Sequence, residues 1–193
     1  MKAARPDAWR MHLHWQADNL VLRDWLRDRH SLTQRFSHCY RHFEVRCLAQ
    51  GLKPLRPDEA ACLGARPGQR AWTREVLLVC DALPVVFGHT VMLRHPRHSF
   101  DRGFHALGSR PLGGLLFSDP RIVRGPLEFR SLDARHPFYR RAIQALGAAA
   151  LPSSLWARRS RFNHRAKGVL VTEVFLSAAL PAAALPVNVF SVR

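Results

Sequence analysis

The sequence predicts one domain of the α+β class, built around an antiparallel β-sheet. Two strand hairpins are indicated, at residues 72–93 and 159–176, and helical patterns precede and separate them instead of alternating with single strands. That order favours an antiparallel sheet over repeated β-α-β units. A length of 193 residues, 47% of them hydrophobic, suits one folded domain with a substantial core. We therefore expect a single domain over residues 1–193, with loosely ordered termini at 1–18 and 182–193.

Two short helices are expected near the N-terminus. Asn19 is placed to cap the first, whose apolar residues recur within 20–26. Ser31 and Gln34 then form a capping-box pattern, in which each side chain can bond a backbone amide near the other residue. Apolar residues at three- and four-residue steps follow within 32–43, which indicates a second helix.

A strand is predicted to begin near Arg41, because apolar residues alternate through 43–47. Residues 51–69 contain three prolines and three glycines, a composition typical of a long connection. One helical turn is expected within it, at 58–63.

The strongest strand pattern covers residues 72–80. Turn-forming residues 81–84 and a second strand over 85–93 complete the first hairpin. The second hairpin pairs 159–163 with a clear strand at 168–176.

The middle of the chain is less regular. A helix is expected within 104–117, ending near Gly108, and another over 138–146. The remainder of 119–152 fits strand and loop equally well.

The formal net charge is +16, from 30 Lys and Arg against 14 Asp and Glu. A charge of this size favours an anionic partner. The cations are almost all arginine and are spread along the chain, and the densest groups, 94–98 and 158–161, lack the interleaved aromatic residues of a stacking platform. We therefore expect no specific nucleic-acid partner, although the field would attract a small anion.

Several other classes of protein are disfavoured. No run of about 18 apolar residues occurs, so no transmembrane segment is expected. The N-terminal residues lack the apolar stretch of a secretory signal, which favours a cytoplasmic protein. The four cysteines contain no C-x-x-C pair and the eleven histidines no H-E-x-x-H motif. We therefore expect free thiols and no metal site.

Two charged residues interrupt apolar strand faces. Period-two spacing places Arg74 on the face that carries Val76, and Glu173 on the face that carries Val171. Charged side chains on such faces are seldom buried unless they are paired or used. An arginine fork suits a carboxylate, and a glutamate can accept a hydrogen bond from a hydroxyl group. The structural alternative is an ion pair between the two, or pairs with Glu75 and nearby arginines.

Five segments together resemble the chorismate pyruvate-lyase (chorismate lyase) family of ubiquinone biosynthesis, and they occur in the family's order. The segments are LRDWLRDRHSLTQRF (22–36), AWTREVLLVCDALPVVFGHTV (71–91), LGSRPLGGLLF (107–117), LWARRSRF (155–162) and KGVLVTEVFL (167–176). The resemblance implies an α+β fold with a highly twisted antiparallel sheet, flanking helices and an enclosed ligand cavity. It also implies a monomeric, cofactor-independent enzyme that converts chorismate to 4-hydroxybenzoate and pyruvate.

The resemblance also implies a set of site residues. The family's substrate-contacting arginine corresponds to Arg74 and its buried glutamate to Glu173. A backbone contact corresponds to Leu112, and an apolar wall residue, often methionine in the family, corresponds to Leu32. Without the resemblance, core packing is the ordinary explanation for both leucines.

The chain departs from the family pattern at a few places. His89 stands where some relatives carry a second arginine, which puts one carboxylate contact in question. The segment 119–154 is longer than in relatives, and the residues after Pro181 have no counterpart. The main alternative function is a non-catalytic effector domain of the same fold, as in some bacterial regulators. No helix-turn-helix pattern precedes residue 20, which disfavours it.

Overall fold

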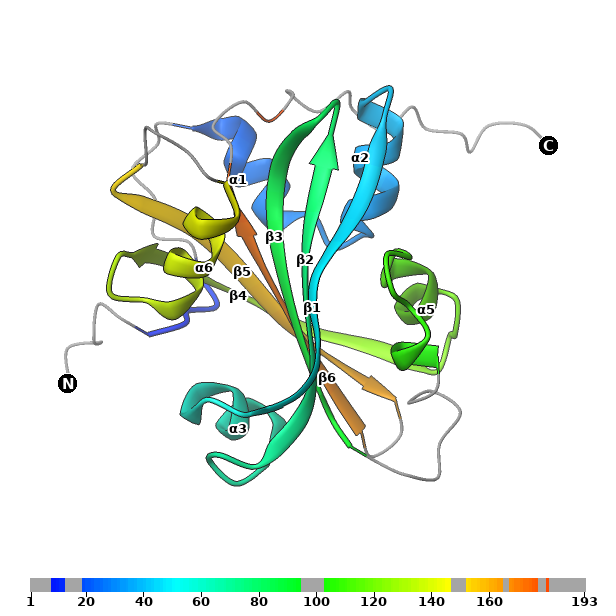
Figure 1. Cartoon of the computed structure of the whole chain (residues 1–193), viewed down its shortest axis with the longest axis vertical. Helices are drawn as coiled ribbons and strands as arrows, with labels where there is room; N and C mark the ends of the chain where they lie inside the picture. Colours follow the sequence, from blue (N-terminus) through cyan, green and yellow to red (C-terminus); the bar gives the residue numbers. More distant parts are fainter. Residues whose placement is uncertain are drawn as a thin grey trace.

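Six strands form one antiparallel sheet in the order β1-β2-β3-β6-β5-β4. Figure 1 shows the strands crossing near the middle of the molecule, with the helices around them. The computed structural model describes residues 8–12, 19–94, 103–146, 152–164, 167–176 and 180. The strands are β1 (Phe43–Pro54), β2 (Arg70–Cys80), β3 (Leu83–Leu93), β4 (Ile122–Asp133), β5 (Ser154–His164) and β6 (Lys167–Phe175). The helices are α1 (Leu20–Arg27), α2 (Leu32–Cys39), α3 (Pro57–Leu63), α5 (Gly113–Phe117) and α6 (Pro137–Leu146). The α+β class and the antiparallel sheet are confirmed.

The two predicted hairpins lie beside each other at the centre of the sheet. β2 joins β3 through a two-residue turn, and β3 pairs with β6. Both turn residues, Asp81 and Ala82, have positive φ angles of 45° and 68°. Such angles are those of a turn whose twist matches that of the flanking strands. The side chain of Asp81 also accepts a hydrogen bond from the His42 amide at 2.9 Å, which fixes the turn against the start of β1.

Both N-terminal helices begin where their capping residues predict. The Asn19 side chain accepts a hydrogen bond from the Leu22 amide at 2.9 Å. The Ser31 hydroxyl accepts one from the Gln34 amide at 3.5 Å. These contacts satisfy backbone donors that have no partner inside the helix.

One sequence-based expectation about strands was wrong, and one strand lies in a segment that the sequence left open between strand and loop. β1 continues to Pro54 instead of ending before residue 51, because a bulge between Cys47 and Ala49 shifts the register and lets pairing with β2 continue. β4 was not predicted, because Gly125 and Pro126 interrupt its pattern. A register shift between Arg124 and Leu127 accommodates them, and an edge strand tolerates the missing proline donor.

The expected helix within 104–117 was also wrong in extent. Only residues 103–105 and 113–117 are helical, with turns between them. The short helix at 58–63 and the helix at 138–146 are confirmed as α3 and α6. Within the expected loose N-terminus, Arg10 pairs with Phe129 of β4 through two backbone hydrogen bonds of 3.0 and 2.8 Å. The segment 182–193 lies outside the described residues.

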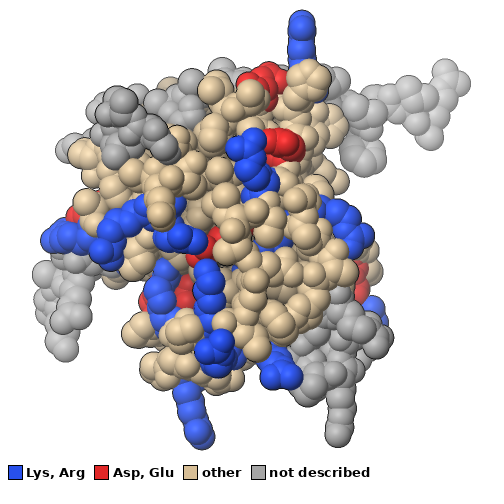
Figure 2. Space-filling view, viewed as in Figure 1, with Lys and Arg blue, Asp and Glu red and all other residues tan. Residues whose placement is uncertain are grey.

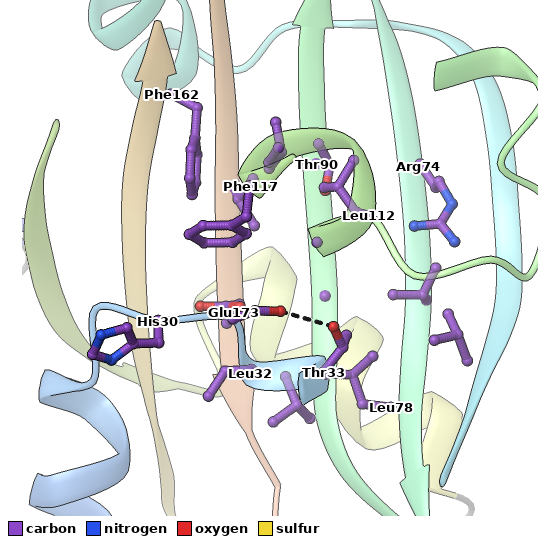
Figure 3. Close-up of a pocket in the computed structure, with 18 of the residues that line it drawn as sticks. His30, Leu32, Thr33, Arg74, Leu78, Thr90, Leu112, Phe117, Phe162 and Glu173 are labelled. Carbon is purple, nitrogen blue, oxygen red and sulfur yellow. Dashed lines mark hydrogen bonds between the residues drawn. The ribbon is translucent and has the colours of Figure 1, made fainter. Parts of the chain in front are cut away.

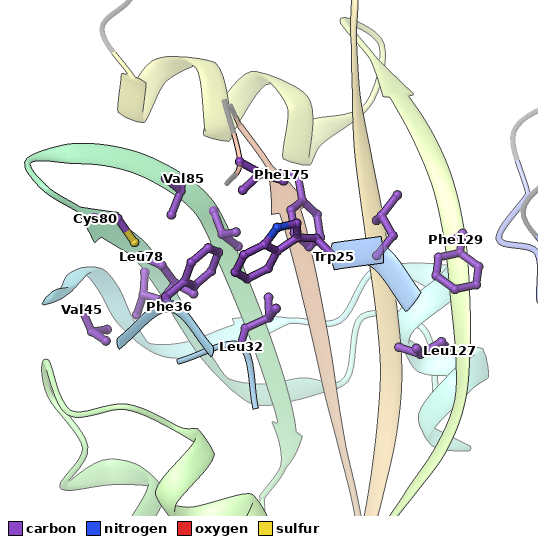
Figure 4. Packing of buried hydrophobic residues seen from close by; sticks show 14 residues of the cluster. Trp25, Leu32, Phe36, Val45, Leu78, Cys80, Val85, Leu127, Phe129 and Phe175 are labelled. Atoms are coloured by element: carbon purple, nitrogen blue, oxygen red, sulfur yellow. The ribbon is translucent and has the colours of Figure 1, made fainter. Parts of the chain in front are cut away.

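Helices cover both faces of the sheet. α1 and α2 pack on one face, where the Trp25 and Phe36 rings lie side by side (Figure 4). The two rings stack with their centroids 4.5 Å apart. α5 packs on the same face around Phe162. α3 and α6 pack on the opposite face, where α6 contributes Phe138. Among the described helices, none is long and apolar enough to span a membrane.

His136 is buried at the start of α6. Its Nδ1 accepts a hydrogen bond from the Phe138 amide at 3.2 Å, which requires an unprotonated nitrogen. Burial, and then the positive charges of Arg130 and Arg56, lower the pKa of His136 to about 4 from 6.5. Since the folded-state pKa is depressed, protonation favours the unfolded chain. The associated stability is present above pH 6.5 and is lost as the pH falls towards 4.

We expect the His136→Asn variant to lose part of this acid sensitivity. Between pH 6.5 and 4 its free energy of unfolding should fall less steeply than that of the unchanged protein, because asparagine does not bind a proton. Urea denaturation at several pH values measures the slope. His42→Asn, at an exposed histidine, is the control and should leave the slope unchanged. Equal slopes for His136→Asn and the unchanged protein would contradict this assignment.

Candidate functional site

A largely apolar pocket lies on the sheet face covered by α2 and α5, as Figure 3 shows. Its volume is about 70 Å³, several times the roughly 10–15 Å³ that one water molecule needs. The sheet forms its floor and the starts of α2 and α5 form its cover. The lining residues are His30, Ser31, Leu32, Thr33, Val45, Arg74, Val76, Leu78, Val86, Gly88, Thr90, Leu112, Gly113, Leu116, Phe117, Arg124, Phe162, Val171 and Glu173. All four residues expected from the sequence are among them.

Arg74 is a buried cation, and within the part of the chain that the structure describes it has no carboxylate partner. It lies in β2 with only 2% of its surface exposed. Its Nε and Nη2 donate to the Gly108 carbonyl at 3.2 and 2.8 Å, and Nη2 also donates to the Arg110 carbonyl at 2.9 Å. Among the described residues, no carboxylate lies within 4 Å of it. Burial lowers the pKa of Arg74, with the Cys47 thiol opposing the shift.

The Arg74 contacts also shape the cover of the pocket. Gly108 has a φ of +51°, a conformation that favours glycine, and this loop conformation presents its carbonyl to the guanidinium. The loop leads to Leu112, whose side chain lines the pocket at the N-terminal end of α5. In the described part of the chain, the Leu112 N–H has no acceptor. Arg74 therefore fixes the segment that carries this free donor.

Glu173 lies in β6 and is paired with an arginine that the strand pattern alone does not single out. Arg158 is its cross-strand neighbour in β5 and donates through Nε to a Glu173 carboxylate oxygen at 2.6 Å. Arg158 is fully buried, and its Nη1 donates to the carbonyls of Trp25, at 2.9 Å, and Asp28. The ion pair between Arg74 and Glu173, the structural alternative raised by the sequence, is not formed among the described residues. Glu173 is instead held by Arg158 and faces the pocket.

Leu32 and Gly113 lie where α2 and α5 meet. Leu32 is buried at 3% exposure, directly after the Ser31 cap. A Cβ atom at Gly113 would lie 2.5 Å from the Ser31 hydroxyl and 3.0 Å from that of Thr33. Those two hydroxyls are joined by a 2.9 Å hydrogen bond, drawn dashed in Figure 3. The glycine therefore lets the two helix starts close over the pocket.

Arg124, in β4, is a second arginine in the pocket. Its Nε donates to the Ser160 hydroxyl at 2.9 Å and its Nη1 to the Arg29 carbonyl at 2.6 Å. Its guanidinium carbon lies 5.1 Å from the centroid of the Phe162 ring. Burial lowers the pKa of Arg124 to about 10, although the Glu173 charge opposes this shift. No local signal in the sequence points to it, because β4 has no recognisable strand pattern.

His89 does not belong to the pocket. It lies between two buried carboxylates, with Nε2 3.0 Å from Glu59 and Nδ1 3.3 Å from Glu75, and its ring packs on Phe138. These residues are on the α3 and α6 side of the sheet, whereas Thr90, the next residue along β3, lines the pocket. Because side chains alternate between the two faces of a strand, position 89 faces away from the pocket. A histidine there therefore removes no carboxylate-binding group from the pocket.

The arginine-rich segment 158–161 is divided between the two sheet faces. Arg158 and Ser160 face the pocket side, through their bonds to Glu173 and Arg124. Arg159 faces the other side and pairs with Glu128 and Asp58, at 2.7 and 3.0 Å. The segment is therefore no exposed basic patch. Figure 2 shows that basic side chains are scattered over the visible face, with few acidic ones among them. The other dense group, 94–98, lies outside the described residues apart from Arg94.

The described residues contain no group of three or more His, Cys, Asp or Glu side chains placed to hold a metal ion. The cysteines are free thiols.

The chain matches the family described as "Chorismate lyase" over residues 6–183. It is 50% identical over 159 residues to the "Probable chorismate pyruvate-lyase" of Aromatoleum aromaticum, covering 82% of this chain and 86% of that protein. It is 48% identical over 163 residues to the protein of the same name from Azoarcus sp., covering 82% and 85%.

Solved structures of bacterial regulators share the fold. The PhnF C-terminal domain superposes with a TM-score of 0.56 at 13% identity, covering 77% of this chain and 89% of that one. A GntR-family regulator from Bacillus cereus superposes with a TM-score of 0.52 at 11% identity, covering 72% and 94%. At these identities the likeness shows a common fold alone.

We expect Arg158→Met to destabilise the protein by about 3–5 kcal/mol, because it leaves the Glu173 charge and several buried carbonyls without a partner. Urea denaturation measures the loss. Arg121→Met, at an exposed arginine paired with Asp119, is the matched control and should leave stability nearly unchanged. A loss below about 1 kcal/mol for Arg158→Met, a small fraction of what breaking a buried pair costs, would show that this cation is not a structural anchor.

We expect Gly113→Ala to lower the free energy of unfolding by about 1–3 kcal/mol, because the added methyl group would force the Ser31 hydroxyl, and with it the start of α2, away from α5. Gly114→Ala is the adjacent control, since nothing lies within 4 Å of a Cβ atom there. That variant should be neutral or slightly stabilising. If Gly113→Ala and Gly114→Ala had the same free energy of unfolding, a close contact at position 113 would not determine the stability of the protein.

Proposed function

Because this chain belongs to the chorismate lyase family, we propose that it is a chorismate pyruvate-lyase, converting chorismate to 4-hydroxybenzoate and pyruvate. The observation that carries the proposal is Arg74, a buried cation that lines an apolar pocket and has no carboxylate partner among the described residues. A buried charge needs a counter-charge, and a substrate carboxylate would supply it. Glu173 lines the same pocket and offers an acceptor for a hydroxyl group. The arrangement suits a ring that carries a carboxylate and a hydroxyl at opposite ends.

The proposed reaction makes modest demands on the protein. The ether bond to the ring breaks, the ring loses the hydrogen of its hydroxyl-bearing carbon and becomes aromatic, and the released enolpyruvate takes up a proton to become pyruvate. All atoms of chorismate are accounted for in the two products, and no oxidant or reductant is consumed. Because aromatisation is strongly favourable, a fixed substrate conformation in a dry, electrostatically matched pocket provides most of the catalysis.

Each site residue has a separate role in this proposal. Arg74 holds the ring carboxylate. Glu173, kept in place by Arg158, accepts a hydrogen bond from the ring hydroxyl and is placed to assist proton movement. The free Leu112 N–H orients the ring, and Leu32 closes the apolar wall. Two helix starts cover part of the pocket, and in this proposal they slow the departure of the product.

The proposal extends to the enzyme's setting. We expect a cytoplasmic, monomeric lyase that uses neither metal nor organic cofactor and supplies 4-hydroxybenzoate to ubiquinone biosynthesis. The chemistry supports cofactor independence, because the elimination is redox-neutral and Arg74 provides positive charge for the substrate carboxylate.

The experiment is to mix the purified protein with chorismate and to quantify 4-hydroxybenzoate and pyruvate together. Equal amounts of both products, at a rate above that of the uncatalysed reaction, are expected. Folded protein that forms neither product would overturn the proposal. A protein that binds 4-hydroxybenzoate without turning over chorismate would instead be a non-catalytic effector domain of this fold.

Arg74→Gln should reduce kcat/KM for chorismate by about 100-fold or more, the equivalent of about 2.7 kcal/mol, because a charge-assisted contact to the carboxylate is lost. Arg110→Gln is the control: this exposed side chain is not part of the pocket lining, and substitution leaves its carbonyl bond to Arg74 in place. Steady-state kinetics measure both. The Arg74 variant should retain any salt-dependent association with DNA, which depends on overall charge. Unchanged kinetics in Arg74→Gln would contradict its role.

A further inference from the structure

Arg124 is a pocket-lining cation with an unused donor. Its Nε and Nη1 are held by the Ser160 hydroxyl and the Arg29 carbonyl, which fix the plane of the guanidinium. Among the described residues, Nη2 has no hydrogen-bond partner, and no carboxylate lies within 4 Å of the side chain. Phe162, which also lines the pocket, lies beneath the guanidinium. The group is therefore rigidly positioned and still able to bind an anion.

The two pocket arginines lie on opposite sides of Glu173. Arg74 is on β2, Glu173 on β6 and Arg124 on β4, and the sheet order is β2-β3-β6-β5-β4. The charge of Glu173 opposes the lowering of the Arg124 pKa that burial causes. A ligand that fills the pocket therefore meets one cation beside β2 and a second cation beyond the carboxylate.

The pocket arginines and Glu173, counted together with the Arg158 that pairs with Glu173, carry about two positive units of charge. Glu173 is neutralised by Arg158, so Arg74 and Arg124 have no paired carboxylate among the described residues. This balance fits a ligand with two negative charges separated by a neutral polar group. The product 4-hydroxybenzoate carries one carboxylate, whereas chorismate carries a second on its enolpyruvyl ether.

We infer that Arg124 binds the enolpyruvyl carboxylate of the substrate, so that it selects the dianionic substrate over the monoanionic product. The inference rests on the proposed function and adds a specificity-determining residue to it. When the ether bond breaks, the carboxylate bound to Arg124 departs with pyruvate, while Arg74 keeps the carboxylate of the aromatic product. Arg124 therefore contributes to the binding of substrate and pyruvate but not to that of 4-hydroxybenzoate.

The test compares substrate and product affinity in Arg124→Gln. The KM for chorismate should rise at least tenfold, while the inhibition constant of 4-hydroxybenzoate should change less than threefold. Arg124→Lys keeps the charge and should recover part of the loss. Arg74→Gln should weaken both ligands, and Arg121→Gln, an exposed arginine just before β4, should weaken neither.

Two outcomes would overturn the inference. One is a KM for chorismate within threefold of the unchanged protein, and the other is an equal loss of chorismate and 4-hydroxybenzoate affinity. Thermal unfolding of each variant shows whether it folds. If Arg124→Gln does not fold, the affinities for chorismate and 4-hydroxybenzoate are compared in Arg124→Lys. The proposed function fails separately, if the unchanged protein itself does not convert chorismate.

Discussion

The arrangement of the pocket depends on the burial of one charge, that of Arg158. A guanidinium with no solvent contact needs hydrogen-bond partners inside the protein. Arg158 has partners both in the sheet and at the end of α1. Carbonyls at the end of α1 accept from it, a favourable place for a cation because the helix dipole is negative there. The carboxylate of Glu173 occupies another of its donors. One side chain therefore docks α1 on the sheet and aims Glu173 into the pocket.

The strands that carry the pocket are anchored from the opposite face by a second set of charges. Along β2, Arg74 faces the pocket while Glu75 faces α6, where it meets His89 and Arg141. Burial alone would raise the pKa of Glu75, but hydrogen bonds from His89 and Arg141 lower it well below the usual range. The carboxylate therefore stays charged, and its pairs tie α6 to the back of the sheet. Strand alternation lets neighbouring residues serve binding on one face and stability on the other.

Much of the fold was predictable because its signals are local. Helix caps at Asn19 and Ser31 and the two central hairpins depend on residues close in sequence. β4 was not predictable, since Pro126 breaks its pattern and only pairing with β5 makes a bulged strand stable there. The site residues also divide into those with a local sequence signal and those without one. Arg74 and Glu173 stood out as charges on apolar faces, whereas Arg124 lay in the strand that local pattern did not reveal.

The sequence by itself determined which residues carry charge on apolar strand faces, where the hairpins turn, and to which family the motif order belongs. Only the tertiary structure decided the partners of those charges. Glu173 pairs with Arg158 and not with Arg74, because β6 lies beside β5 and two strands away from β2. Arg74 consequently bonds to backbone carbonyls, and among the described residues no carboxylate pairs with it. The physical reason is that a side chain's neighbours across a sheet are set by strand order and register, which a single chain's local pattern does not encode.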